Sequence, residues 1–128
     1  MDSDWADAIG LCDAGAVREL LERGADVDAR DRYGQTGLML AAHAGCRDVV
    51  AVLVEHGVSL DVTAKFGLSA LMLAVVAGHV EIARLLVRAG ADLSLKGSGA
   101  PGFAGKTARD LALARGMQEL AVELAPRR

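Results

Sequence analysis

The chain has 128 residues, of which 52% are hydrophobic and 3% aromatic, and its formal net charge is −3. This length suits one domain, and the slightly acidic balance argues against nucleic-acid binding, because no excess of Lys and Arg is available to displace counterions. No apolar run approaches the ~20 residues that cross a bilayer, and residues 1–4 lack the pattern of a secretory signal, so we expect a cytoplasmic protein.

The first segment, residues 1–30, predicts a short helix pair whose second helix covers residues 16–23. We expect Trp5 to cover the open end of this pair. Cys12 and Cys46 are the only cysteines, too few for a disulfide framework, so both are predicted to be packed thiols, with a regulatory disulfide as the rarer alternative.

Two middle segments repeat each other at a spacing of 33 residues: Gly34–Gly57 and Gly67–Gly90 share 10 of 24 positions. In each segment a hydroxyl residue, Thr36 or Ser69, is predicted to cap a helix that ends at Gly45 or Gly78. The second helix of each unit follows. Val49–Val54 has β propensity but aligns with a clearly helical stretch, so we expect a helix there. A fixed period of this length is typical of stacked supersecondary units.

The last segment repeats the same pattern after an insertion. Gly105–Ala112 matches Gly34–Ala41, and the surplus residues form a Gly- and Pro-rich stretch, residues 97–102. That stretch predicts a flexible surface loop.

The pattern Gly-x-Thr-x-Leu-x-x-Ala-Ala-x-x-Gly, followed by a helix and Gly-Ala-Asp, resembles the ankyrin repeat over about residues 4–125. The resemblance implies an all-α solenoid forming one domain of four units, with hairpin-like loops and a concave binding face. The expected units are residues 1–30, 31–63, 64–96 and 97–128. Gly37, Ala70 and Ala108 stand where the family usually has proline, and Met39, Met72 and Asp110 stand where it usually has histidine.

The same resemblance implies a non-enzymatic protein–protein interaction module (a scaffold, adaptor or inhibitor) without cofactor or metal, and without nucleic-acid or membrane partners. Three aromatic residues, Tyr33, Phe66 and Phe103, fall close to one phase of the repeat; they either form a contact surface or pack on neighbouring loops. Leu68 and Val76 are expected to be exposed and to enlarge the apolar patch. The full set of expected partner-binding residues is Arg32, Tyr33, Gln35, His43, Lys65, Phe66, Leu68, Val76, Phe103, Lys106 and Arg115.

Three alternatives remain open. Residues 100–107 satisfy a relaxed phosphate-loop pattern ending in Gly105-Lys106-Thr107, although no apolar strand precedes it. His43 and Cys46, with Cys12 or His79, could be imagined as metal ligands, but no second pair has a matching spacing. Finally, residues 1–31 have a net charge of −6 and residues 84–128 one of +4, so a chain expected to be a monomer could also self-associate weakly, head to tail.

Overall fold

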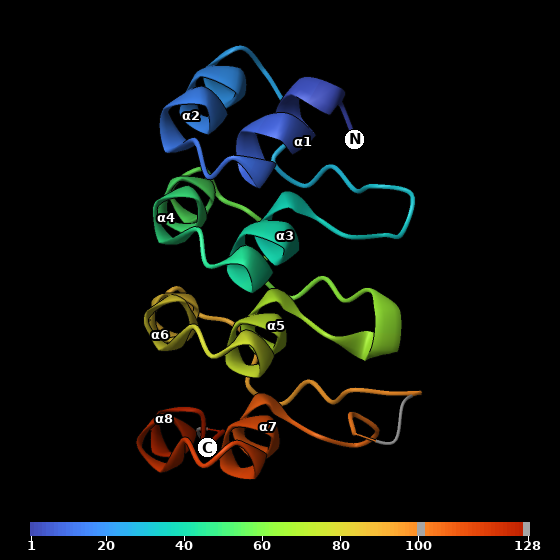
Figure 1. Ribbon diagram of the computed structural model, residues 1–128, viewed down its shortest axis with the longest axis vertical. Coiled ribbons are helices and arrows are strands. Elements are labelled where there is room, and N and C mark those ends of the chain that lie inside the picture. The colour runs from blue at the N-terminus through green and yellow to red at the C-terminus, as the bar shows by residue number, and fades with distance from the viewer. Residues whose placement is uncertain (100–101, 127–128) are drawn as a thin grey trace.

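The computed structural model describes residues 1–99 and 102–126, and this part of the chain contains eight α-helices and no β-strand. The helices form two columns, and loops project to one side of the inner column (Figure 1). Each helix packs on its partner within a pair and on the equivalent helix of the next pair. The inner column consists of α1 (Ser3–Gly10), α3 (Gly37–Ala44), α5 (Ala70–Ala77) and α7 (Ala108–Ala114); the outer column consists of α2 (Ala14–Glu22), α4 (Arg47–Glu55), α6 (Val80–Arg88) and α8 (Gln118–Glu123). The predicted all-α solenoid is therefore confirmed.

The inner helices begin and end where local chemistry predicts. The hydroxyl oxygens of Thr36, Ser69 and Thr107 each accept a hydrogen bond from the amide three residues later, at 3.2–3.3 Å. Gly45 and Gly78 end α3 and α5 with φ of +87° and +82°, a conformation that costs glycine little. The predicted helix over Val49–Val54 is part of α4, which shows that stacking overrides its β propensity.

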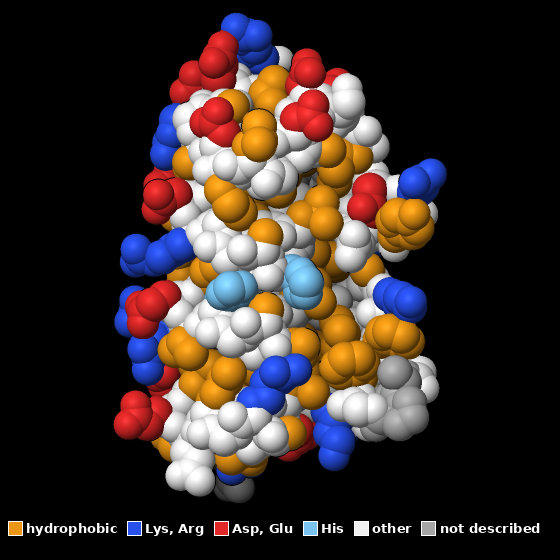
Figure 2. All heavy atoms as spheres, in the orientation of Figure 1, with side chains coloured by type: hydrophobic (Ala, Val, Ile, Leu, Met, Phe, Trp, Pro, Cys, Tyr) orange, Lys and Arg blue, Asp and Glu red, His pale blue; other side chains and the backbone are white. Residues whose placement is uncertain are grey.

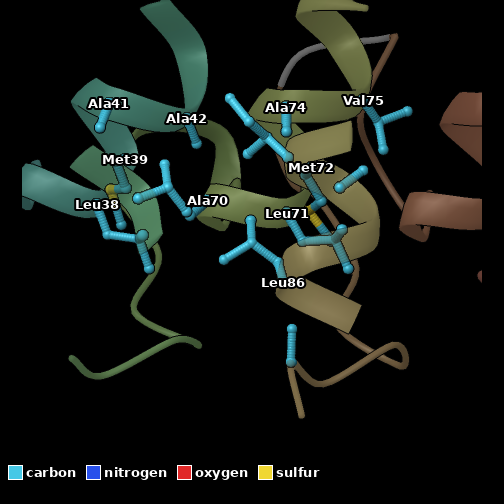
Figure 3. Packing of buried hydrophobic residues seen from close by; sticks show 14 of the residues in the cluster. Leu38, Met39, Ala41, Ala42, Ala70, Leu71, Met72, Ala74, Val75 and Leu86 are labelled. Atoms are coloured by element: carbon cyan, nitrogen blue, oxygen red, sulfur yellow. The ribbon is translucent and has the colours of Figure 1, made fainter. Parts of the chain in front are cut away.

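The core is built mainly from the inner helices. Small side chains let α3 and α5 approach closely: Ala41, Ala42 and Ala74 have no exposed surface, and larger side chains fill the space beside them (Figure 3). Met39 and Met72, at the position where the family usually has histidine, are each 1% exposed and belong to this apolar cluster. The core therefore runs continuously from one repeat to the next rather than closing within each unit.

The N-terminal end of the stack is acidic (Figure 2). Asp4, Asp7 and Glu19 line a groove between α1 and α2, together with Leu11, which is 78% exposed. At the opposite end, the predicted excess of positive charge includes Arg127 and Arg128, which lie outside the described residues. Within residues 1–99 and 102–126, no helix combines the length and hydropathy needed to span a membrane.

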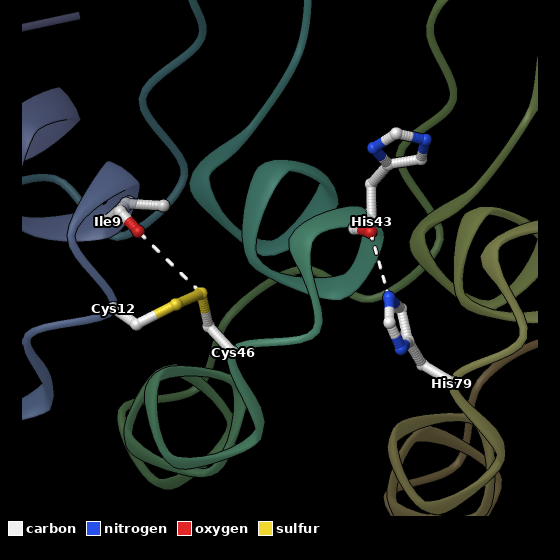
Figure 4. Close-up of a disulfide and its surroundings, with 5 residues drawn as sticks. All are labelled: Ile9, Cys12, His43, Cys46 and His79. Carbon is white, nitrogen blue, oxygen red and sulfur yellow. Dashed lines mark hydrogen bonds between the residues drawn. A yellow bond between two sulfur atoms is a disulfide. The ribbon is translucent and has the colours of Figure 1, made fainter.

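Cys12 and Cys46 form a disulfide, so the prediction of two packed thiols is wrong. Their Cα atoms are 5.3 Å apart, and the bond joins the turn between α1 and α2 to the residue that precedes α4 (Figure 4). The two cysteines are 34 residues apart, one repeat period plus one. Stacking therefore brings equivalent turns of neighbouring repeats together, within the range that a disulfide spans.

The expectation that Trp5 covers the open end of the first helix pair is wrong. Its ring is 2% exposed and lies in the joint between α1 and α3, where a Cβ atom added to Gly37 would lie 3.1 Å from the indole Nε1. The same added Cβ would lie 2.5 Å from Cδ1 of Ile9. The apolar carbons of the indole gain from this buried joint, although its N–H has no hydrogen-bond partner among the described residues, and Gly37 leaves the room that the ring needs.

Candidate functional site

The loop between the first two helix pairs carries an exposed aromatic ring on a rigid tip. Asp31 Oδ1 accepts hydrogen bonds from the amides of Tyr33 and Gln35, both at 2.9 Å, and the Asp31 carbonyl accepts one from Gly34 at 3.0 Å. The Tyr33 side chain is 67% exposed, and the Arg32 guanidinium lies 5.2 Å from the centre of its ring. A cation and an aromatic ring are thus held together on a preformed turn.

The second loop, between α4 and α5, packs on the third loop, between α6 and α7. The rings of Phe66 and Phe103 lie with their centroids 5.6 Å apart, and the Ser98 amide donates to the Phe66 carbonyl at 2.7 Å. Phe66 has a φ of +63°, and the Lys65 ammonium lies 4.9 Å from its ring centre. Of the two interpretations that the sequence leaves open, packing between loops therefore describes Phe66 and Phe103, whereas Tyr33 is free to contact another molecule.

The described ends of the Gly-rich insertion are tied to the same loops. The Gly97 amide donates to the Lys106 carbonyl at 2.9 Å, and the Gly105 amide donates to the Gly97 carbonyl at 3.0 Å. Gly97 is buried, since a Cβ there would contact the Phe103 backbone. Residues 100 and 101 lie outside the described residues.

The predicted binding residues at the base of the loops differ in exposure. Lys106 is exposed and Gln35 is half-buried, but Leu68 is only 6% exposed, so the expectation of an exposed Leu68 is wrong. Its backbone pairs with Ala64 and Lys65 across the loop, and its side chain joins the core cluster. An aliphatic side chain at the base of a loop gains from burial, whereas the amide of Gln35 does not.

The remaining predicted binding residues lie at the ends of the inner helices. His43 and Arg115 are exposed and Val76 is half-buried. The His79 ring nitrogen Nε2 donates to the His43 carbonyl at 3.1 Å and so ties neighbouring repeats together (Figure 4). His79 therefore links two neighbouring repeats, and the His43 side chain faces solvent.

The phosphate-loop pattern has a different structural explanation. The Thr107 hydroxyl accepts from the Asp110 amide at 3.2 Å, and the Thr107 amide donates to Asp110 Oδ2 at 3.1 Å, forming a capping box at the start of α7. The backbone amide of Thr107 lowers the pKa of Asp110 by hydrogen bonding to its carboxylate. The Thr107 hydroxyl, at the position that holds Mg²⁺ in a phosphate loop, here caps α7. Ala100 and Pro101, at the start of the pattern, lie outside the described residues.

The metal site considered from the sequence would need the thiol of Cys46 and, in one version, that of Cys12 as ligands. In the structure these two cysteines are bonded to each other. Among the described residues, no group of three or more His, Cys, Asp or Glu side chains is placed to hold a metal ion. The disulfide was the less favoured of the two alternatives for these cysteines, although their separation of one period plus one residue could have indicated it.

Comparison with known families agrees with the geometry of the stack. A family model for ankyrin repeats, in three copies, matches residues 8–97 of the chain. No curated protein matches it.

Proposed function

The chain belongs to the ankyrin repeat family, and from this premise we propose that it is a non-enzymatic module that binds another protein on its loop tips and concave face. Ankyrin repeats generally mediate protein–protein interaction, and the family is typically non-enzymatic. A role as scaffold, adaptor or inhibitor follows from this: the stack presents a preformed surface, which limits the ordering cost of association.

The observation that carries the proposal is the Arg32–Tyr33 pair. A large aromatic ring that is 67% exposed gains free energy when a partner covers it, and aromatic and Arg side chains are the residue types that dominate binding hot spots. Phe66 and Phe103 support the site by ordering the neighbouring loops. Leu68 is left out of the proposed surface because it is buried. The other proposed contact residues are Gln35, His43, Lys65, Val76, Lys106 and Arg115.

The test is a comparison of loop variants with a matched surface variant. Proteins captured from the source cells by the wild-type chain supply the candidate partner, whose affinity is then measured by calorimetry. Tyr33→Ala combined with Phe66→Ala is expected to weaken binding at least tenfold with helical content nearly unchanged. Val122→Ala removes a side chain that is 76% exposed on α8, away from the loops, and is expected to leave affinity unchanged. Equal losses in both variants, or no loss in either, would refute the surface assignment.

The organisation of the chain belongs to the same proposal. We expect one domain with unit boundaries near residues 30, 63 and 96, a monomer in solution, and neither nucleic-acid nor membrane partners. Light scattering at low and high salt checks the monomer, because head-to-tail association through charged ends would weaken as salt rises.

The cytoplasmic location stays a prediction, and the Cys12–Cys46 disulfide counts against it. Disulfides persist mainly in oxidising compartments and are rare in cytosolic proteins. Alkylation of free thiols in freshly acid-quenched source cells decides the matter: a reduced pair agrees with a cytoplasmic location, and a fully formed disulfide contradicts it.

A further inference from the structure

The loop column carries cations that have no carboxylate partner within the described residues. Arg32, Lys65 and Lys106 are all exposed, and none of them forms an ion pair with residues 1–99 or 102–126. The ion pairs of this part of the chain instead involve the outer column, as in Arg18–Glu55 and Arg84–Glu123. The positive charge of the loops is therefore available to a ligand.

The carboxylates of the loops accept hydrogen bonds from their own turn or from the neighbouring loop. Asp31 accepts from two amides of its own turn, and Asp28 accepts from the amide and hydroxyl of Ser59 at 2.8 and 2.9 Å. Asp61 accepts from the amide of Asp92 at 2.8 Å. The inner helices α3 and α5, which face the loops, contain no Asp or Glu. The loop face of a chain whose net charge is −3 thus presents cations and few free anions.

The stacking geometry sets the spacing of these charges. Arg32 and Lys65 occupy equivalent positions, 33 residues apart, on consecutive loops, and packed helices of neighbouring repeats lie about 10 Å apart. A segment in the extended polyproline II conformation has three residues per turn and advances about 3.1 Å per residue, so every third side chain lies on the same face and meets the next loop. Lys106 places a further cation on the third loop, between α6 and α7.

The surface beside the cations is apolar. Figure 2 shows hydrophobic side chains between the inner helices and the loops, where Val76, Phe66 and Phe103 remain half-exposed. A ligand for this face therefore combines negative charge with apolar groups. A protein segment has both, whereas the outer surface of a nucleic acid is mostly charged phosphate.

We propose that this face recognises an extended, acidic segment of the partner protein, with Asp or Glu at about every third position and apolar residues between. The inference rests on the proposed function and names the chemistry of the partner. Arg32 and Lys65 pair with successive carboxylates, and the apolar side chains between them lie against the inner helices.

The experiment uses defined peptides, so it needs no knowledge of the natural partner. Labelled peptides of about twelve residues, long enough to span three loops, are built from Glu-Leu-Ser, Gln-Leu-Ser or Lys-Leu-Ser triplets. Their binding to the full chain is measured by fluorescence anisotropy at low and high salt, with a single-stranded oligonucleotide of similar length as a further probe. The test variant is Arg32→Glu with Lys65→Glu. The control, Arg47→Glu with Arg88→Glu, makes the same charge change at exposed positions of the outer column.

The Glu peptide is expected to bind about tenfold more tightly than the Gln peptide at low salt, and high salt should reduce the difference. The loop variant should lose this preference and favour the Lys peptide, while the control variant keeps it. Four results would overturn the inference: equal binding of the Glu and Gln peptides, no binding by any peptide, an equal effect of the two variants, or tighter binding of the oligonucleotide. The first of these results also separates the two proposals. If the Glu and Gln peptides bind equally well and Tyr33→Ala abolishes this binding, the partner segment need not be acidic, but the proposed function still stands.

Discussion

Replacing Cys12 with serine is expected to loosen the first helix pair from the stack before the rest of the chain unfolds. Cys12 is exposed, so the serine hydroxyl stays in water and no buried polar group is created. The freed Cys46 thiol is 4% exposed, and its sulfur lies 3.8 Å from the Ile9 carbonyl, to which it can donate. The substitution therefore removes the covalent link with little other disturbance.

The size of the effect follows from the length of chain that the disulfide closes. The cysteines are 34 residues apart, and the loss of loop entropy in the unfolded chain corresponds to roughly 4 kcal/mol. A terminal repeat is held by one neighbour only, so this loss falls on the contacts of α1 with α3 and of α2 with α4. If the free energy of unfolding falls by about 2 kcal/mol per molar urea, the unfolding midpoint of this repeat should fall by about 2 M.

The only tryptophan of the chain reports on this joint directly. Trp5 is buried between α1 and Gly37, so its fluorescence changes when the first repeat detaches. Urea titrations followed by Trp5 fluorescence and by far-ultraviolet circular dichroism should coincide in the oxidised wild type. In Cys12→Ser the fluorescence transition should come first, because circular dichroism reports on all eight described helices.

Reduction of the wild type with a dithiol should reproduce the behaviour of the variant, and the same reductant should leave Cys12→Ser unchanged. If oxidised wild type and variant unfold at the same urea concentration by Trp5 fluorescence, the disulfide does not hold the first repeat in place, and the reasoning is refuted.

Two further predictions concern helix starts. Gly37→Ala should destabilise the chain because the added Cβ would crowd Ile9 and Trp5. Such overpacking costs about 1–3 kcal/mol, which outweighs the helix propensity of about 1 kcal/mol that alanine gains over glycine. Thermal unfolding at or above the wild-type midpoint would contradict this. Because the pKa of Asp110 is lowered in the folded state by the amide of Thr107, its charged form stabilises the fold above the ordinary value of 3.8, and this contribution is lost as the pH falls below it. Asp110→Asn keeps an acceptor for the cap without the charge, so its urea midpoint should fall less steeply than that of the wild type between about pH 5 and 2; parallel pH profiles would contradict the assignment.

Several features of this protein could be predicted because they depend on neighbours in the sequence. Thr36 and Ser69 cap the helices that follow them, and Gly45 ends α3 in a left-handed conformation, because each interaction closes within a few residues. The period of 33 residues predicted that the units stack, and the alignment of the repeats predicted that Val49–Val54 is helical. The exposure of Tyr33 is one of the two outcomes that the sequence left open for the loop aromatics.

What the sequence by itself determined is thus the repeating unit: its caps, its glycine-ended helices and the apolar faces that require a stack. Only the tertiary structure decided which groups meet between units. It paired Cys12 with Cys46, placed Trp5 against Gly37, packed Phe66 on Phe103 and buried Leu68. The physical reason is that each of these contacts, or the space that a side chain fills, depends on the exact approach of neighbouring repeats, which the period implies but does not specify in atomic detail.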